Sequence, residues 1–198
     1  MRNFFENRLY HWLTTACRLI VLSFLFLFTS IPLFTFGASM TALYHCISRE
    51  CMENSTRLYR DYFSAFKANF RQSLPPTILF LLYAMVMLIE LSQVWLGNGT
   101  NLLPPFLWML LFLLLFVLSQ YIFATISHLA APFPATLLLS VRLMIGHIKE
   151  TFILLFIMAG ACLLMIPVPG LFVLIPGFLC CIASHLIEPG IKKALNLS

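Results

Sequence analysis

Glu90 is the most unusual of the few side chains in this sequence that could do chemistry. It lies in a long apolar stretch, and Ser92 and Gln93 follow it closely. If this stretch crosses a membrane, an ionisable group within it is costly and commonly marks a pathway or a partner. Alternatively, Glu90 reaches the outer interface, since it lies only about five helical rises of 1.5 Å from Trp95.

A second polar group, Ser119, Gln120 and Tyr121, interrupts another apolar run near its middle. Such groups usually form hydrogen bonds between helices within a membrane. Contact with a substrate is the functional alternative. We therefore take four residues as hypothetical binding residues: Glu90, Gln93, Ser119 and Gln120.

Histidines and cysteines are the remaining candidates for metal or nucleophile chemistry. His45, His128 and His185 fall near the same ends of their apolar segments and could share a metal or relay protons. However, they have no acidic neighbour and no closely spaced second ligand. The six cysteines show neither CxxC nor zinc spacing. His-Glu-x-x-His, a Walker lysine loop and a nucleophile elbow are also absent. We therefore predict no metal, no cofactor and no enzymatic activity.

The composition points to a membrane protein. Of the 198 residues, 61% are hydrophobic and 10% are charged, whereas soluble domains have about 45–50% apolar and about 25% charged residues. The apolar runs are continuous, which argues against a transmembrane barrel. The net charge of +5 fits basic residues that face anionic lipid on the cytoplasmic side, and no separate basic patch suggests nucleic-acid binding.

These runs predict an all-α polytopic membrane protein that forms one domain over residues 1–198. It should have about six transmembrane helices, with amphipathic helices beside the membrane. The predicted segments are an interfacial helix at 1–17, spans one and two at 19–48, a cytoplasmic helix at 50–73, spans three and four at 77–129, a cytoplasmic helix at 135–150, and spans five and six at 151–187. A cleaved signal peptide is the alternative at the N-terminus, but the length of the apolar run argues against it.

Prolines and glycines mark where the helices should break or approach one another. We expect Pro75-Pro76 to precede the third span, and Pro189-Gly190 to end a last helix that is bent at Pro176-Gly177. The second span, near Ala38–Ile47, is too short to cross alone, so it is tilted, re-entrant or continued past Arg49. Close packing in this hairpin should depend on Pro32, Gly37, Ala38, Thr41 and Ala42.

The distribution of basic residues predicts the orientation. With a cytoplasmic N-terminus and six crossings, every Lys and Arg falls on the cytoplasmic side. The three turns on the opposite side contain neither residue. Both termini are therefore expected in the cytoplasm.

Two motifs resemble those of the YesL family of bacterial integral membrane proteins, a domain without assigned activity. The first comprises Pro32, Thr35, Gly37, Ala38, Thr41, Ala42, Leu43 and Tyr44, and the second Tyr62, Phe63, Phe66, Lys67, Asn69 and Phe70. The resemblance covers about residues 14–73. It implies a protein of the bacterial plasma (inner) membrane, often encoded beside carbohydrate uptake and sensing systems, and it brings no catalytic residue.

Our main expectation is a non-enzymatic accessory or regulatory membrane protein associated with carbohydrate uptake or sensing. Besides the lipid bilayer, its partner would be another membrane protein such as a transporter or sensor, and a homo-oligomer is also open. Four residues of the cytoplasmic helix would dock the partner: Phe63, Phe66, Lys67 and Phe70. The alternative is a small transporter or permease-like subunit, because proline-broken helices and Glu90 could line a path.

Overall fold

The computed structural model describes residues 2–47, 58–95, 104–129, 131–165 and 175–194. Within these ranges every regular element is a helix, so the chain is all-α as predicted. The elements are α1 (Arg2–Thr29), the short 3-10 helix η1 (Leu33–Thr35), α2 (Phe36–Ile47), α4 (Leu58–Trp95), α5 (Pro105–His128), α6 (Phe133–Gly146), α7 (Ile148–Met165) and α8 (Ile175–Ala194).

The helices are those of a polytopic membrane protein. Two of them, over Leu58–Gln93 and Phe106–His128, are long and apolar enough to cross a bilayer. α6 and α7 make a third span if they are counted together, although they are bent by 94° at their junction. The remaining apolar helices are shorter, and α2 has only 12 residues. Length and apolarity in the described residues therefore identify two or three crossings, where about six were expected.

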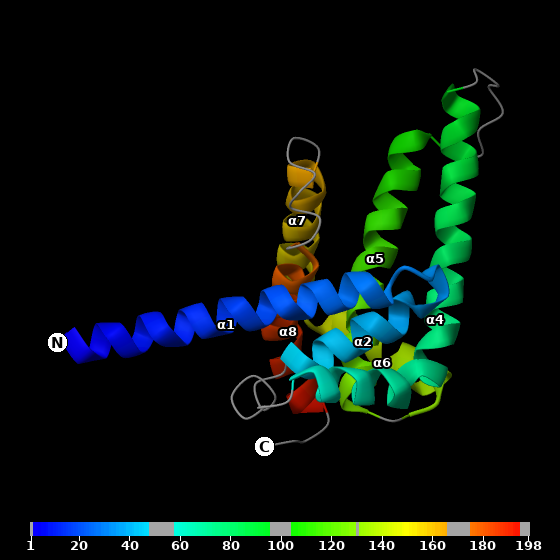
Figure 1. The fold of residues 1–198 in the computed structure, drawn as a ribbon. Helices are drawn as coiled ribbons and strands as arrows, with labels where there is room; N and C mark the ends of the chain where they lie inside the picture. The colour runs from blue at the N-terminus through cyan, green and yellow to red at the C-terminus, as the bar shows by residue number, and fades with distance from the viewer. Residues whose placement is uncertain (1, 48–57, 96–103, 130, 166–174, 195–198) are drawn as a thin grey trace.

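The helices run in two directions (Figure 1). The second part of α4 stands beside α5 as an upright hairpin, and α7 and α8 form a second upright pair. In contrast, α2 and the first part of α4 lie across the lower part of these hairpins, and α1 crosses above α2. α6 is likewise turned by 94° from the upright α7. The segment predicted as the first two spans thus runs across the α4–α5 hairpin and not alongside it.

Several helix limits differ from those expected at prolines. α1 continues without a break to Thr29, so the predicted interfacial helix and the start of the first span are one helix. Pro176 lies in the first turn of α8, where a missing N–H costs little, and so it begins the helix without bending it. α8 also continues through Pro189 to Ala194. Burial of Ile191 stabilises this last turn and offsets the cost of the proline.

α4 likewise remains a helix through Pro75 and Pro76, but it turns there from lying to upright (Figure 1). Hydroxyl groups on both sides of the prolines bond to backbone carbonyls. Ser73 Oγ donates to the carbonyl of Asn69 at 2.9 Å, and Thr77 Oγ1 donates to that of Ser73 at 2.6 Å. These bonds satisfy the two hydroxyls within the helix beside the prolines.

The short helix α2 is the centre of the packing. Ten of its 12 residues are buried, and it contacts α1, α4, α5 and α8. At Gly37 the neighbouring helices come so close that a Cβ atom would overlap the Thr77 hydroxyl. The same Cβ atom would lie 2.8 Å from the Phe123 ring and 2.9 Å from the Ser73 carbonyl oxygen. Of the other residues expected to pack this hairpin, Ala38, Thr41 and Ala42 are buried, whereas Pro32 is exposed in the reversal.

Substitution of Gly37 by alanine tests this contact. Because backbone as well as side-chain atoms occupy the space, we expect Gly37→Ala to lower the free energy of unfolding by about 1–3 kcal/mol. Denaturant titration of the purified chain in mixed micelles measures this loss. Gly160→Ala is the matched control: nothing lies within 4 Å of its Cβ position, so stability should stay the same or rise slightly. Equal effects at both glycines would contradict the proposed close contact.

Candidate functional site

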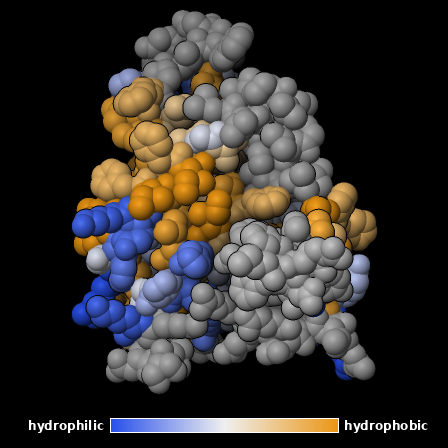
Figure 2. Space-filling model, turned by 90° about the vertical axis from the view of Figure 1, so that its left-hand side faces the viewer, coloured by the Kyte–Doolittle hydropathy of each residue, from blue (hydrophilic) through white to orange (hydrophobic). Residues whose placement is uncertain are grey.

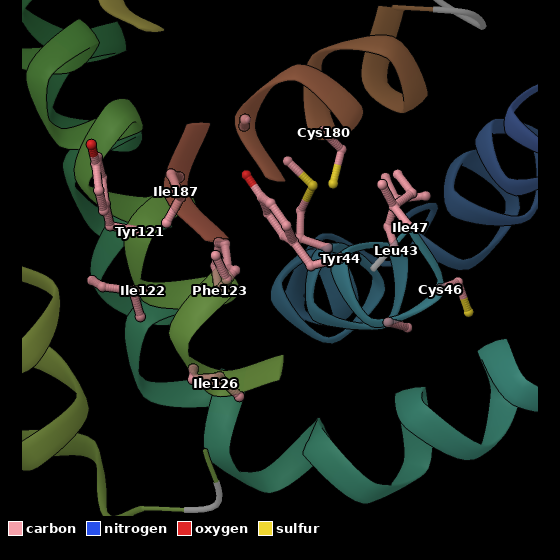
Figure 3. Close-up of a cluster of buried hydrophobic side chains, with 14 of the residues drawn as sticks. Leu43, Tyr44, Cys46, Ile47, Tyr121, Ile122, Phe123, Ile126, Cys180 and Ile187 are labelled. Carbon is pink, nitrogen blue, oxygen red and sulfur yellow. The ribbon is translucent and has the colours of Figure 1, made fainter. Parts of the chain in front are cut away.

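A buried polar cluster lies between α2, α5 and α8. Tyr44 of α2 donates a hydrogen bond from its hydroxyl to Oε1 of Gln120 at 2.7 Å. Gln120 is fully buried, and its Nε2 has no hydrogen-bond partner among the described residues. Figure 3 shows Cys180 of α8 beside the Tyr44 ring. This cluster therefore joins three helices by polar contacts, at the cost of one unpaired donor.

Neighbouring Ser119 lies in a different environment from Gln120. Its Oγ donates to the carbonyl of Phe116 at 2.7 Å, within the same helix. Ser119 also lines an almost wholly apolar cavity of about 100 Å³ between α4, α5 and α6. The two adjacent polar residues thus point to different places and do not form one binding group.

Glu90 and Gln93 are far from Ser119 and Gln120 along the α4–α5 hairpin. The register is given by the Tyr83 hydroxyl, which donates to the Trp108 carbonyl at 3.2 Å. From this level Glu90 lies about 10 Å towards the far end of the hairpin, and Ser119 about 16 Å in the opposite direction, at 1.5 Å per residue. The four hypothetical binding residues are therefore not brought together, and the transporter alternative gains no shared polar site.

The first part of α4 has one buried and one exposed face. Tyr62 is fully buried, and its hydroxyl lies 2.8 Å from Thr29 Oγ1 and 3.4 Å from the Ser39 carbonyl. Phe66 and Phe70 contact each other, with ring centroids 5.8 Å apart, and are partly buried. Of the four residues expected to dock a partner, these two therefore face the bundle.

The opposite side of this segment carries exposed aromatic and basic residues. We call it the outer face of α4, and it consists of Tyr59, Arg60, Phe63, Lys67 and Arg71. Tyr59 is 59% exposed and Phe63 is 43% exposed. The segment lies beneath α2, on the side away from the tip of the α4–α5 hairpin (Figure 1). Only Phe63 and Lys67 of the predicted docking residues belong to this face.

Gln72 is a structurally important residue that our sequence reasoning missed. Its Nε2 donates to the Ala131 carbonyl at 2.5 Å and lies 3.3 Å from the Leu129 carbonyl and 3.4 Å from Thr136 Oγ1. One amide thus connects α4 to the link between α5 and α6. These partners lie 57 to 64 residues away in sequence, and no local pattern indicates them.

The histidines do not converge on a metal site. No group of three or more His, Cys, Asp or Glu side chains in the described part of the chain could hold a metal ion. His185 is exposed, whereas His45 and His128 each have interaction partners.

Comparison with known proteins finds a family match in the first part of the chain. Residues 4–91 match the model of a family described as a protein of unknown function, DUF624. This region contains α1, η1, α2 and most of α4, including Gly37, Tyr44 and the outer face of α4. The match supports an uncharacterised-domain family over less than half of the chain and carries no activity. No curated protein and no solved structure matches the chain.

A double-mutant cycle tests the hydrogen bond between Tyr44 and Gln120. Tyr44→Phe leaves a buried Gln120 oxygen without its donor, so we expect a loss of about 1–3 kcal/mol in the free energy of unfolding. Adding Gln120→Leu removes both amide atoms, including the unpaired Nε2, and should restore part of that loss. Denaturant titration of the four proteins gives the coupling energy. Strictly additive losses would mean that the two side chains do not interact.

Gln72→Glu tests the link between α4 and the α5–α6 connection. The substitution keeps the shape of the side chain but replaces the donor by an acceptor that faces two carbonyl oxygens. We expect Gln72→Glu to lower the free energy of unfolding by about 1–3 kcal/mol relative to the native chain. Gln72→Ala should cause a smaller loss. Thermal unfolding in detergent compares the three proteins. If Gln72→Glu were as stable as the native chain, the Gln72 amide would not be holding these carbonyls together.

Proposed function

We propose that this chain is a non-enzymatic accessory or regulatory membrane protein that binds another membrane protein through the outer face of α4. The observation that carries the proposal is the pairing of exposed Tyr59 and Phe63 with basic residues on a helix whose other face is buried. Aromatic residues and arginine are enriched at protein interfaces and supply much of their binding energy.

The position of the outer face favours a protein partner over lipid. α2 lies between the first part of α4 and the hairpins that contain the most apolar helices (Figure 1). The outer face therefore points away from the side on which hydrocarbon would cover the α4–α5 hairpin. Aromatic rings that face water are unfavourable unless a partner covers them.

Charge indicates what the partner should present. Arg60, Lys67 and Arg71 are all exposed, and they flank the two aromatic residues. An acidic segment containing apolar side chains would complement both features. We therefore propose that the outer face binds an acidic cytoplasmic segment of the partner.

The resemblance to the YesL family suggests where that partner belongs. The proposed setting is the bacterial plasma membrane, with both termini of this chain in the cytoplasm and a partner from a carbohydrate uptake or sensing system. The concentration of basic residues on cytoplasm-facing segments supports this orientation.

Photo-crosslinking in native membranes tests the proposal. A photoreactive phenylalanine analogue placed at Tyr59 or at Phe63 should crosslink the same membrane protein, identified by mass spectrometry. The same analogue at Leu88, which is 65% exposed on the upright part of α4, is the matched control and should not capture it. Lys67→Glu should reduce the crosslink at least several-fold, and a compensating Asp→Lys or Glu→Lys change in the partner should restore it.

Three results would contradict the proposal. Capture of lipid alone would make the outer face a membrane anchor, and a crosslinked species of twice the chain's mass would make it a homo-oligomer interface. Identical yields from Phe63 and from Leu88 would mean that the outer face has no specific partner.

A further inference from the structure

We infer that a cavity between α6 and α8 binds the phosphate of an anionic phospholipid head group. The cavity has a volume of about 410 Å³ and is lined by residues near the C-terminal ends of both helices, among them Arg142 and Lys193, and by His147 at the junction of α6 and α7. The cavity is much larger than the roughly 30 Å³ that one water molecule occupies in the liquid. It therefore has room for a lipid head group. The site is separate from the outer face of α4.

Two cations of different helices face this cavity. Arg142 of α6 and Lys193 of α8 are both exposed, and neither forms an ion pair among the described residues. An anion bound in the cavity would be attracted by both charges. The arginine fork suits two phosphate oxygens, and the lysine ammonium suits a third.

His147 is held at the same cavity by the bend between α6 and α7. Its backbone N–H bonds to the Leu143 carbonyl at 2.9 Å, and its carbonyl accepts bonds from Thr151. Its ring lies against Gly190 of α8, with ring atoms 3.0 to 3.3 Å from where a Cβ of that glycine would be. The ring therefore lies at the wall of the cavity, where an imidazole N–H can add a hydrogen-bond donor beside the two cations.

The surroundings of the cavity favour a lipid over a soluble anion. Leu139 and Leu143 form its apolar wall. Close by in sequence are large apolar side chains that are mostly exposed: Leu138, Ile145, Ile148 and Phe152, the first being 73% exposed. On the left of the face shown in Figure 2, the described hydrophobic surface lies above hydrophilic surface, a pattern typical of a protein at a membrane boundary. Basic pockets between helices at the cytoplasmic boundary are suited to anionic head groups.

The alternative role for these cations is electrostatic stabilisation near the helix ends: Lys193 lies in the last turn of α8, where a basic side chain is favourable, and Arg142 lies just before the last turn of α6. Both roles predict a loss of stability when the charges are removed. Only a lipid site predicts that stability depends on the charge of the lipid. The identity of the added lipid therefore separates the two explanations.

The test uses the full chain in nanodiscs of phosphatidylcholine, with or without phosphatidylglycerol. We expect phosphatidylglycerol to raise the thermal unfolding temperature, and a fluorescent phosphatidylglycerol to bind at least tenfold more weakly to Arg142→Gln/Lys193→Gln. The matched control is Lys67→Gln/Arg71→Gln, which removes two exposed charges from the outer face of α4 and should leave lipid binding unchanged. If the double variant does not fold, Arg142→Lys keeps the charge but not the fork and should weaken binding by itself.

Three outcomes would overturn the inference. Equal stabilisation by the two lipids would leave only the role at the helix ends. Equal loss of lipid binding in the control variant would mean a diffuse electrostatic attraction. Stabilisation by inorganic phosphate to the same extent as by phosphatidylglycerol would make this a site for a soluble anion.

Discussion

The close approach of α2 to α4 and α5 at Gly37 is the contact on which the arrangement of this protein depends. No side chain fits there, because the Ser73 carbonyl, the Thr77 hydroxyl and the Phe123 ring occupy the space. α2 is too short to span a bilayer, yet almost all of it is buried among four longer helices. The small residue thus lets a lying helix pack against the base of the upright hairpin, and the remaining contacts of the bundle are made around it.

Only some of the buried polar groups connect one helix of this bundle to another. Most buried hydroxyls bond within their own helix, as Thr41 does to the Gly37 carbonyl and Thr125 to that of Tyr121. Such bonds satisfy the hydroxyl group but do not connect one helix to another. Contacts between helices are fewer, and they include Tyr44 with Gln120, Tyr62 with Thr29, Tyr83 with the Trp108 carbonyl, Ser140 with Thr125, Tyr121 with Thr151, and Gln72 with the α5–α6 link. Because lipid competes poorly for hydrogen bonds, these few contacts help to define which helices are neighbours.

The two surfaces proposed to bind partners use the same kind of charge for different ligands. On the outer face of α4, Lys67 and Arg71 accompany exposed aromatic rings on a lying helix. Arg142 and Lys193 both line the open α6–α8 cavity, beside exposed leucine and isoleucine. A flat aromatic surface suits a protein segment, whereas a cationic cavity beside apolar surface suits a lipid. Both belong to the parts of the chain in which basic residues gather.

Local features of the sequence predicted the class of the protein, its helical content and the shortness of α2. Hydropathy and the length of an apolar run can be read without knowing which segments meet in the fold. Of the four residues expected to dock a partner, Phe63 and Lys67 are exposed. Other features could not be predicted, because they arise from contacts between residues far apart in the chain. Phe66 and Phe70 turned inward, Ser119 was separated from Glu90, and α8 continued past Pro189 because Ile191 is buried. Gln72 acquired its role from carbonyls more than fifty residues away. Local patterns specify which segments are apolar helices, and packing between them specifies their directions and which of their side chains meet.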